Sequence, residues 1–298
     1  MKFIEPQVDW WPQTSLIRHI ARVGRICYKA KGKQPEEGMS EDEAEEFILK
    51  RDAERCKGFW ESGHRSMYRH GTIYYFMPNE KGLPNHIWAS MTASPYIDYA
   101  TKNHKVWIST NMQFLLENKE LMDALIPYDV SEEEFIEKAQ KYECEDAFSI
   151  IRMTMVVTTQ ISTSRELNRT SPNNIAEQST RYCNLEKKGG VQIARPHWYN
   201  GGTRWQRMVY GLVCRVCEWG YNRLLKSDMK PQDARGVLPL DTYTVVAYTY
   251  TLAEWSHILD LRFHGTTGTP HPNAKIISEK IRNIIIERMR NYCEEFEI

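Results

Sequence analysis

Residues 152–162, RMTMVVTTQIS, constrain the fold more than any other stretch of the sequence. They are mostly Met, Val and Thr, and the stiff β-branched side chains of Val and Thr favour extended backbone. This run leads directly into residues 164–184, SRELNRTSPNNIAEQSTRYCN, where arginines stand among Ser, Thr and Asn. The second segment has too few apolar residues to be a core element throughout. The sequence therefore predicts a strong strand that leads into a polar, arginine-bearing segment.

Helical and strand patterns are mixed along the rest of the chain. Sequence patterns predict helices at residues 14–30, 40–63, 131–144, 205–225, 253–264 and 273–296. Strand-like stretches occupy residues 72–78 and 104–110, whereas 241–251 fit either a strand or a buried helix, with the β-branched content favouring the strand.

Local signals add detail to these elements. Ser131 and Glu134 form a capping box at a helix start, and Gly63 is suited to end a helix. The last helix carries an isoleucine stripe that belongs to a core or to a subunit interface. Because no regular βαβ alternation is present, we expect an α+β fold in one domain, residues 1–298.

The overall charge and hydropathy exclude several classes of protein. Lys+Arg and Asp+Glu are equal at 39 each among 298 residues, so a broad nucleic-acid footprint, which needs a basic excess, is not expected. No apolar run is long enough for a membrane span, and the first residues lack the apolar core of a signal peptide. We therefore expect a cytoplasmic protein that does not bind nucleic acid or membranes.

Seven cysteines are scattered along the chain, which fits reduced thiols in a cytosol. Cys214 and Cys217 form one CxxC, but zinc needs two more ligands at suitable spacing and no partner pair is present. Both lie in a helical apolar pattern, so we expect them to face a helix core. No metal site is predicted.

The polar segment is chemically suited to phosphate. Arginine offers a permanently charged, bidentate fork, and Ser179 and Thr180 offer hydroxyls beside Arg181. A solvated loop whose arginines pair with Glu166 and Glu177 explains the composition equally well. Neither a GxGxxG nor a Walker loop occurs in the sequence.

The segment also resembles the signature of flavin-dependent thymidylate synthases, in which Arg-His-Arg precedes a Ser by seven intervening residues. Counted back from Tyr182, Ser179 matches that Ser, and the triplet falls on Arg169, Thr170 and Ser171. Further stretches resemble family elements in the family's order, over about residues 20–280. They are GRICY (24–28), GHRSMYRHGTIYYF (63–76), WISTNMQFLLE (107–117), ARGVLPL (234–240), WSHILDLR (255–262) and HPNA (271–274).

The resemblance implies a homotetramer in which mixed helices surround an antiparallel sheet and active sites lie between subunits. It implies the conversion of dUMP to dTMP, with methylenetetrahydrofolate as carbon donor, FAD as cofactor and NADPH as reductant. The family uses no cysteine nucleophile, so Cys183 is not expected to be one although it lies within the signature.

The resemblance also assigns substrate roles. Arg262 would lie against the uracil edge and favour its N3-ionised form, whereas Arg181 and Arg235 would hold the phosphate, and Glu166 would accept a hydrogen bond from a sugar hydroxyl. The alternatives are an Arg262 paired with Asp260 or Glu254, an Arg235 that caps a helix end, and a Glu166 paired with Arg165 or Arg169. The full predicted substrate set is Glu166, Arg169, Glu177, Gln178, Ser179, Thr180, Arg181, Arg235 and Arg262.

A second set would contact the flavin. It consists of His70, Thr72, Arg169, Thr170, Ser171, Glu177, Thr251, Ala253 and His257. The sequence departs from the family where Thr170 and Ser171 replace His and Arg, and where Arg69 replaces a Glu. These changes remove one ring and one charge from the flavin edge. We hypothesise that Arg69 or Arg165 compensates.

Two other functions stay open. One is a related pyrimidine-nucleotide C5 modifier, such as a dUMP or dCMP hydroxymethyltransferase, because the flavin-edge triplet is altered. The other is a non-catalytic nucleotide-binding homologue, against which the presence of Arg181, Arg235 and Arg262 argues.

Overall fold

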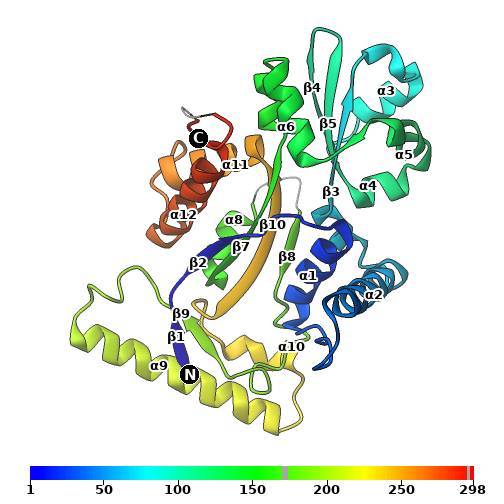
Figure 1. Cartoon of the computed structure of the whole chain (residues 1–298). Coiled ribbons are helices and arrows are strands. Elements are labelled where there is room, and N and C mark those ends of the chain that lie inside the picture. The colour runs from blue at the N-terminus through cyan, green and yellow to red at the C-terminus, as the bar shows by residue number, and fades with distance from the viewer. Residues whose placement is uncertain (170–173, 294–295) are drawn as a thin grey trace.

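The computed structural model describes residues 1–169, 174–293 and 296–298. Two four-stranded antiparallel sheets organise the chain, one central and one in a separate lobe (Figure 1). The central sheet has the order β2 (Gln7–Trp10), β7 (Arg152–Gln160), β10 (Tyr243–Thr251), β8 (Ile175–Glu177). The second has the order β4 (Ile97–Lys102), β5 (Lys105–Asn111), β3 (Thr72–Met77), β6 (Asp129–Val130).

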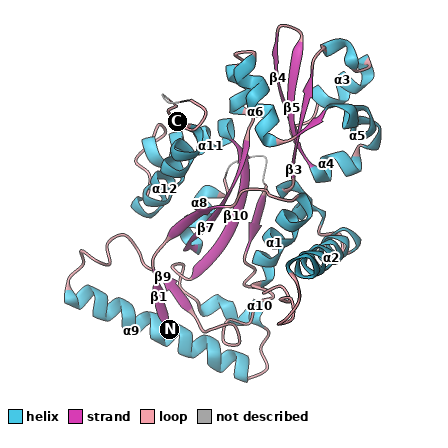
Figure 2. Ribbon diagram, viewed as in Figure 1, coloured by secondary structure: helices cyan, strands magenta, loops and turns pink. Residues whose placement is uncertain are grey.

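A short parallel pair completes the strands, β1 (Lys2–Ile4) with β9 (Gln192–Ala194). The expected α+β class is confirmed, because antiparallel sheets and helices are mixed without βαβ units (Figure 2). The expectation of one antiparallel sheet is corrected, because the strands around residues 72–78 and 104–110 form a sheet of their own.

The helices are interspersed among the strands. They are α1 (Leu16–Tyr28), α2 (Glu41–Glu61), α3 (Asn85–Thr92), α4 (Met112–Glu117), α5 (Lys119–Leu125), α6 (Glu132–Lys141), α7 (Glu145–Ser149), α8 (Ile161–Leu167), α9 (Arg204–Lys226), α10 (Pro231–Ala234), α11 (Leu252–Leu259) and α12 (Pro272–Met289). Short 3-10 turns are η1 (Arg65–His70), η2 (Glu80–Gly82), η3 (Ile126–Tyr128) and η4 (Arg235–Val237), and η5 (Asp260–His264) is a π-helix. The six helices predicted from the sequence are confirmed.

The pair β7–β10 is the backbone of the fold. Nine residues pair in continuous antiparallel register, from Tyr243 opposite Gln160 to Thr251 opposite Arg152. The predicted strand 152–162 ends at Gln160 rather than at residue 162. The reason is that the backbone amides of Ile161 and Ser162 bond to carbonyls of Thr242 and Leu240 as α8 begins.

Helices cover both faces of this sheet, because successive strand residues point to opposite sides. On one face Val156 and Ala247 pack with α1 and α2. On the other face Val157 and Tyr248 pack with α11 and α12. Ile277, Ile281 and Ile285 of α12 are fully buried there, so the isoleucine stripe belongs to the core.

Of the two helix-end signals predicted from the sequence, the structure confirms the glycine in full and the capping box in part. Gly63 follows α2 with φ +81°, a left-handed conformation that suits glycine, as expected. Ser131 caps α6 by accepting a hydrogen bond from the Glu134 amide. The Glu134 carboxylate, however, lies 3.6 Å from Lys138, so the structure shows the hydroxyl half of the predicted capping box.

All seven cysteines are free thiols, as predicted. Cys214 is buried under α9, whereas Cys217 is half-buried, so the expectation of two core-facing thiols holds fully only for Cys214. In the described part of the chain, no helix is both long enough and apolar enough to cross a membrane.

Candidate functional site

The polar segment 164–184 folds around one end of the central sheet. Its first residues complete α8, its middle supplies β8, and the chain then turns through Gln178, Ser179 and Thr180. The turn is fixed from two sides, because the Gln178 amide bonds to the Val245 carbonyl and the Ser179 amide to the Cys27 carbonyl. The segment is therefore an ordered border of the sheet, apart from residues 170–173, which lie outside the described chain.

A cavity of about 330 Å³ opens at this border, and we call it the Glu177 cavity. Its walls come from α8, from the end of β8 with the following turn, from η4, and from the first part of β10. They are Ile161, Arg165, Glu177, Gln178, Ser179, Thr180, Arg235 and Thr244. Five residues of the predicted substrate set thus share one cavity, together with Arg165.

Glu177 is held in place by three neutral donors. One carboxylate oxygen accepts hydrogen bonds from Ser164 Oγ at 2.8 Å and Thr244 Oγ1 at 3.0 Å, and the other accepts from Asn168 Nδ2 at 3.2 Å. Tyr248 donates its hydroxyl proton to Asn168 Oδ1 at 2.7 Å, which turns the amide group of Asn168 toward Glu177. Among the described residues, no cationic side chain pairs with Glu177, so neutral donors alone orient its carboxylate.

Gln178 presents an unused donor. Its side chain is only 4% exposed, and its Nε2 has no hydrogen-bond partner among the described residues. An unpaired buried amide costs about 1–3 kcal/mol, and such groups are rare in native proteins. The Gln178 amide is thus a polar group that the described chain leaves unsatisfied beside the Glu177 cavity.

Two arginines on different elements contribute positive charge to the cavity. Arg165 comes from α8, and Arg235 comes from η4. Arg235 donates from Nη1 to Thr180 Oγ1 at 2.8 Å and from Nε to the Gln232 carbonyl at 3.0 Å. It therefore caps the end of α10, as one alternative predicted, and also reaches the turn that follows β8. Two guanidinium groups and the hydroxyls of Ser179 and Thr180 form a donor set suited to a phosphate.

Arg181 does not line this cavity. It is exposed, donates from Nε to Gln232 Oε1 at 3.2 Å and stacks over the Tyr182 ring at 5.2 Å.

The Arg165 and Arg169 side chains are also exposed, and neither forms an ion pair with Glu166 or Glu177. Within the described chain, these arginines are thus not neutralised by the carboxylates of their own segment.

Arg262 does not line the Glu177 cavity. It belongs to the π-helix η5 and donates from Nε to the backbone carbonyl of Glu166 at 3.1 Å. It pairs with neither Asp260 nor Glu254, whose carboxylate accepts from the Thr251 amide instead. One chain therefore places Arg262 beside the predicted substrate segment but outside its cavity.

The thiols near the cavity are poorly suited to nucleophilic attack. Burial raises the pKa of the Cys27 thiol to about 11, and burial also raises the pKa of Cys183, which is 1% exposed. A thiol must lose its proton to act as a nucleophile. Both thiols stay protonated at neutral pH, in agreement with the expectation that Cys183 is not a nucleophile.

The predicted flavin residues are not gathered by one chain. Glu177 lines the cavity, Arg169 is exposed at the end of α8, and Thr170 and Ser171 lie outside the described residues. Thr251 stands at the opposite end of β10, where its hydroxyl caps α11. The remaining members lie elsewhere, with Ala253 and His257 exposed on α11 and with His70 and Thr72 at the junction of η1 and β3.

The length of β10 gives the distance between the Glu177 cavity and Thr251. Thr244 lines the Glu177 cavity, and Thr251 is seven residues further along the strand. At about 3.4 Å per residue, the two ends are roughly 24 Å apart. His70 is fully buried, and its Nδ1 is engaged by Thr249 Oγ1 at 2.8 Å. Among the described residues, the predicted flavin set is therefore spread along β10 and not gathered in the Glu177 cavity.

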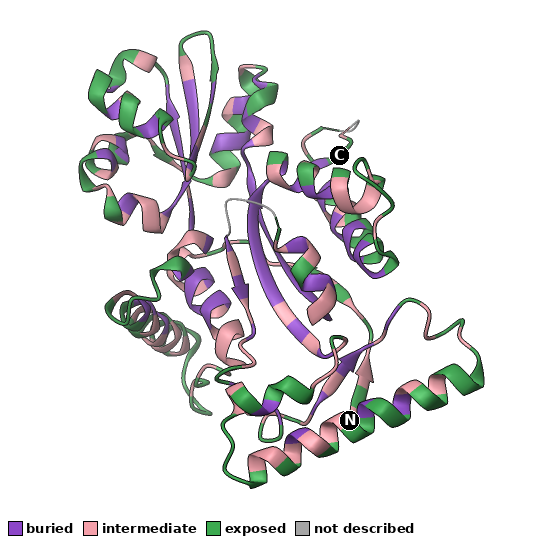
Figure 3. Ribbon diagram, turned by 180° about the vertical axis from the view of Figure 1, so that it is seen from behind, coloured by how far each residue is buried: buried purple, intermediate pink, exposed green. Residues whose placement is uncertain are grey.

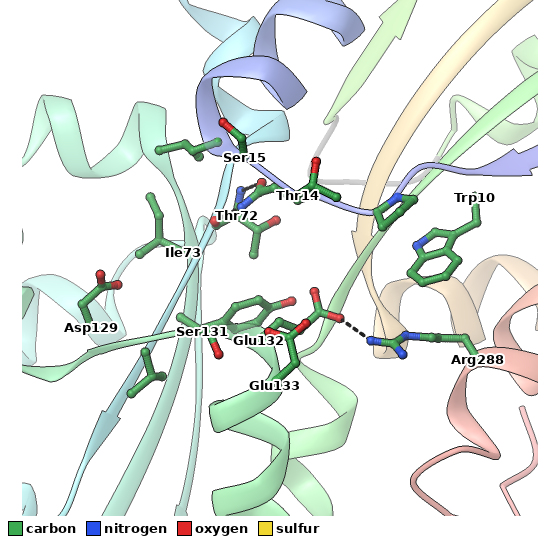
Figure 4. Close-up of a pocket in the computed structure, with 15 residues that line it drawn as sticks. Trp10, Thr14, Ser15, Thr72, Ile73, Asp129, Ser131, Glu132, Glu133 and Arg288 are labelled. Atoms are coloured by element: carbon green, nitrogen blue, oxygen red, sulfur yellow. Dashed lines mark hydrogen bonds and ion pairs between the residues drawn. The ribbon is translucent and has the colours of Figure 1, made fainter. Parts of the chain in front are cut away.

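A larger cavity, about 740 Å³, lies between the two sheets and is drawn in Figure 4. Arg288 reaches into it from α12, 3.3 Å from Glu132 and 5.1 Å from the Trp10 ring centre. Burial raises the pKa of Glu132 and of Asp129. With Glu133, three carboxylates face this space around a single, already paired guanidinium, so it is a poor match for a nucleotide phosphate.

Comparison with known families decides the identity. A family model described as thymidylate synthase complementing protein matches residues 97–289, about two thirds of the chain. The chain belongs to this family. Thymidylate synthase complementing proteins are flavin-dependent in general and are enzymes of the pyrimidine C5-methyltransferase type, so this chain is an enzyme of that type.

Solved structures and curated proteins add little beyond this. The chain is similar to a UMP/dUMP methylase, PolB, from Streptomyces cacaoi, solved with 5-Br dUMP and with 5-Br UMP. The identity is 24%, the TM-scores are 0.41 and 0.40, and the match covers 51% of this chain and 74% and 76% of the other chains. Comparison with curated proteins gives no significant match.

The cavity of this thymidylate synthase complementing protein also contains residues that sequence reasoning missed. Ile161 and Thr244 line it, and Ser164 and Asn168 hold Glu177. Thr244 opens a strand that was recognised, but a strand pattern does not say which threonine faces a ligand. Among the described residues, no group of three or more His, Cys, Asp and Glu side chains is arranged to hold a metal ion.

Proposed function

We propose that this chain is an FAD-dependent thymidylate synthase. It converts dUMP to dTMP, takes the carbon from methylenetetrahydrofolate and uses NADPH as reductant. The chain acts as a single catalytic domain, residues 1–298, in a cytoplasmic homotetramer whose active sites lie between subunits. Family membership supports the reaction class, and the Glu177 cavity carries the more specific proposal.

The cavity supports a nucleotide substrate by its chemistry. Arg165 and Arg235 supply the positive charge that a phosphate needs, and Ser179 and Thr180 supply hydroxyls beside it. The oriented Glu177 carboxylate is an acceptor for a hydroxyl or imide N–H. This set of donors and acceptors matches a pyrimidine nucleoside monophosphate.

Charge stabilisation is the proposed role of Arg262. A fixed guanidinium beside the uracil edge favours ionisation at N3 and stabilises the negative charge that develops on the ring. Its Nε donates to the Glu166 carbonyl. Its Nη groups form no hydrogen bond with another described residue, so they are left for a ligand. Because one chain keeps Arg262 out of its own cavity, we propose that it completes the site in the assembly, with Glu166, Arg169 and Arg181 nearby.

FAD fits the predicted residues only if several copies share it. Glu177 would contact it at the cavity, with Arg169 and with Thr170 and Ser171, which lie outside the described residues, as further members of the set. His70, Thr72, Thr251, Ala253 and His257 would approach from neighbouring copies. When bound and reduced, FAD supplies the electrons of the reaction. The protonated thiols near the cavity support chemistry without a cysteine nucleophile.

A product assay tests this proposal. Purified protein is incubated with dUMP, methylenetetrahydrofolate, NADPH and FAD, and the product is identified by mass spectrometry. The expected product is dTMP, formed only when all four are present. A hydroxymethylated nucleotide would reassign the chain to the hydroxymethyltransferase alternative. Tight dUMP binding with no product would indicate a non-catalytic homologue.

Arg235→Ala is expected to weaken dUMP binding by about 10- to 100-fold, because a hydrogen bond to a charged group contributes roughly 1.5–3 kcal/mol. Isothermal titration measures the effect. Binding of deoxyuridine, which lacks the phosphate, should change much less. Arg290→Ala, which removes an exposed arginine at the end of α12, is the charge-matched control. Equal losses for dUMP and deoxyuridine would show that Arg235 does not act on the phosphate.

Arg165→Ala tests the hypothesis of compensation at the flavin edge. We expect about tenfold weaker FAD binding, measured by flavin fluorescence without dUMP so that nucleotide binding does not contribute, because one guanidinium contact to a phosphate oxygen is lost. Arg69→Ala is the matched comparison and should have a smaller effect. Arg69 already donates to Gln113 Oε1 at 2.9 Å and lies 4.8 Å from the Tyr96 ring centre. Unchanged FAD affinity in Arg165→Ala would contradict the hypothesis.

A further inference from the structure

Helix α9 carries an apolar stripe on its solvent side. The stripe consists of Trp205, Met208, Val209, Leu212, Val213, Val216 and Trp219, and we call it the α9 stripe. These positions follow the i, i+3, i+4, i+7 spacing of one helix face. Trp205, Leu212 and Trp219 are 67%, 58% and 63% exposed. The helix lies along one edge of the molecule, with exposed and half-buried residues over most of its length (Figure 3).

The stripe is not the face that holds α9 to its own chain. The opposite face of α9, where Gly211, Cys214 and Tyr221 are buried, packs against the rest of the chain. The helix is thus apolar on two sides, a pattern typical of helices that are buried on both. The two indoles alone leave on the order of 300 Å² in solvent, since a Trp side chain buries up to about 250 Å². An apolar patch of this extent marks an interaction surface.

The stripe is nearly symmetric about Leu212, which indicates what covers it. Trp205 and Trp219 lie seven residues on either side of Leu212, and Met208 and Val216 lie four on either side. In an antiparallel pair of identical helices, a two-fold axis at Leu212 places each Trp205 against the partner's Trp219 and each Met208 against the partner's Val216. Isologous interfaces require this kind of self-complementarity.

We propose that the α9 stripe is the docking surface for a second copy of this chain, with the two α9 helices antiparallel and Leu212 at the two-fold axis. The exposed Val237 extends the apolar surface from α9, since a Cβ on Gly220 would lie 3.8 Å from Val237 Cγ2. Such a contact supplies the apolar centre of an interface of ordinary size, roughly 800 Å² per partner.

The position of this interface connects it with the Glu177 cavity. Val237 belongs to η4, whose first residue, Arg235, reaches into the cavity. A second copy seated on α9 therefore borders the element that carries one of the two cavity arginines. The inference rests on the proposed function in one respect, because both require identical chains to assemble. The α9 stripe is then the surface through which one contact of that assembly forms.

The molar mass of the full-length chain, measured without ligands by analytical ultracentrifugation, tests the proposal. Leu212→Glu places two carboxylates at the two-fold axis, so the assembly should fall to half its wild-type mass or less. Leu49→Glu, an exposed leucine on α2, should keep the wild-type mass. Circular dichroism verifies that both variants remain folded. A Leu212→Glu variant with the wild-type mass, or a monomeric wild type, would overturn the proposal.

A crosslinking experiment tests the axis itself. Packed helices lie about 8–10 Å apart with Cα atoms about 2.3 Å from each axis, so facing Cα atoms come within disulfide range. In a Cys293→Ser background, which removes the exposed native thiol, mild oxidation should join Leu212→Cys chains into covalent dimers. Leu49→Cys should not crosslink, and failure of Leu212→Cys to do so would contradict the two-fold arrangement.

The main competing occupant is a membrane surface, because Arg204, Arg223 and Lys226 lie at the two ends of α9. Vesicles of phosphatidylcholine with phosphatidylserine address this. Cosedimentation of a monomeric wild type with these vesicles, abolished by Leu212→Glu, would overturn the proposal in favour of membrane docking. Since these measurements need no substrate, a protein that pairs through α9 but makes no dTMP would overturn the proposed function alone.

Discussion

Arg262→Ala is expected to lower the turnover of dUMP by about 10²–10³, the usual effect of removing one donor that stabilises a developing anion. The physical reason is that a methyl group carries no charge and cannot favour N3 ionisation. The setting of Arg262 fits such a role. It lies in a π-helix, a distortion often found at functional sites, and its Nε is fixed to the Glu166 carbonyl at 3.1 Å.

A control separates this effect from a structural one. Arg282 also donates from Nε to a backbone carbonyl, that of Ile298 at 2.8 Å, and is half-buried on α12. Arg282→Ala therefore removes an arginine with a similar anchoring bond but no proposed contact with substrate. Steady-state kinetics with dUMP should show a fall in kcat for Arg262→Ala and little change for Arg282→Ala. Arg262→Lys should recover part of the rate because the charge returns without the planar fork.

The pH profile gives a further readout. If Arg262 favours the N3-ionised base, the variant needs a higher pH to reach a given fraction of ionised substrate, so its rate should rise more steeply with pH than that of the wild type. Arg262→Ala with a wild-type rate and an unchanged pH profile would remove Arg262 from the catalytic set.

The sequence predicted those parts of the fold that depend on local chemistry. The β-branched run at 152–162 and its counterpart at 241–251 became β7 and β10, and the amphipathic patterns became helices. The division into two sheets was missed, because it depends on which strands pair, and pairing is set by contacts between residues far apart in the sequence. The end of β7 at Gln160 likewise depends on carbonyls of Leu240 and Thr242, some 80 positions away.

Some features of the candidate site could likewise be predicted from the sequence, and others could not. Composition and family resemblance pointed to Glu177, Ser179, Thr180 and Arg235, and the structure brings these into one cavity. The unpaired state of the Gln178 amide was invisible in the sequence, since it depends on every neighbour at once. The placement of Arg262 outside the cavity was equally hidden, because one sequence does not say whether two matched residues face the same ligand within one chain.

A buried chain of hydrogen bonds leads to the second prediction. His19 on α1, Thr154 on β7, Thr249 on β10 and His70 in η1 are linked in that order by three bonds of 2.9, 2.7 and 2.8 Å. Two hydroxyls supply two of the three protons, so one imidazole N–H must supply the third. Arg22 donates to Nδ1 of His19 at 2.9 Å, which leaves the proton of a neutral His19 on Nε2. The chain therefore runs from His19 to His70, whose Nδ1 accepts.

This arrangement requires both imidazoles to be neutral. Burial lowers the pKa of His70 to about 3, with Arg69 adding to the effect. Burial and then the charge of Arg22 lower the pKa of His19 to about 3. A proton on His70 Nδ1 would replace its acceptor with a donor facing the Thr249 hydroxyl, so the bond between them would be lost. Protonation is thus opposed by desolvation, by neighbouring arginines and by the hydrogen-bond chain itself.

We therefore expect the folded protein to lose stability as the pH falls below about 6.5, the ordinary histidine value. Between pH 6.5 and 3 the unfolded chain binds protons at both histidines while the folded chain does not. The folded state thus has its full stability above pH 6.5 and loses it progressively toward pH 3. A shift of this size costs on the order of 3 kcal/mol per histidine at pH 4.

Urea unfolding followed by circular dichroism from pH 7 to pH 4 measures this loss. His19→Gln and His70→Gln should each be less stable than the wild type at pH 7, since the hydrogen-bond chain is broken. Each should nevertheless lose less stability per pH unit, by up to about 1.4 kcal/mol, because one fewer proton is taken up on unfolding. His86→Gln, an exposed histidine on α3, should keep the wild-type slope. If neither buried variant changes the slope, at least one imidazole is already charged in the folded protein and the proposed direction of the chain is wrong.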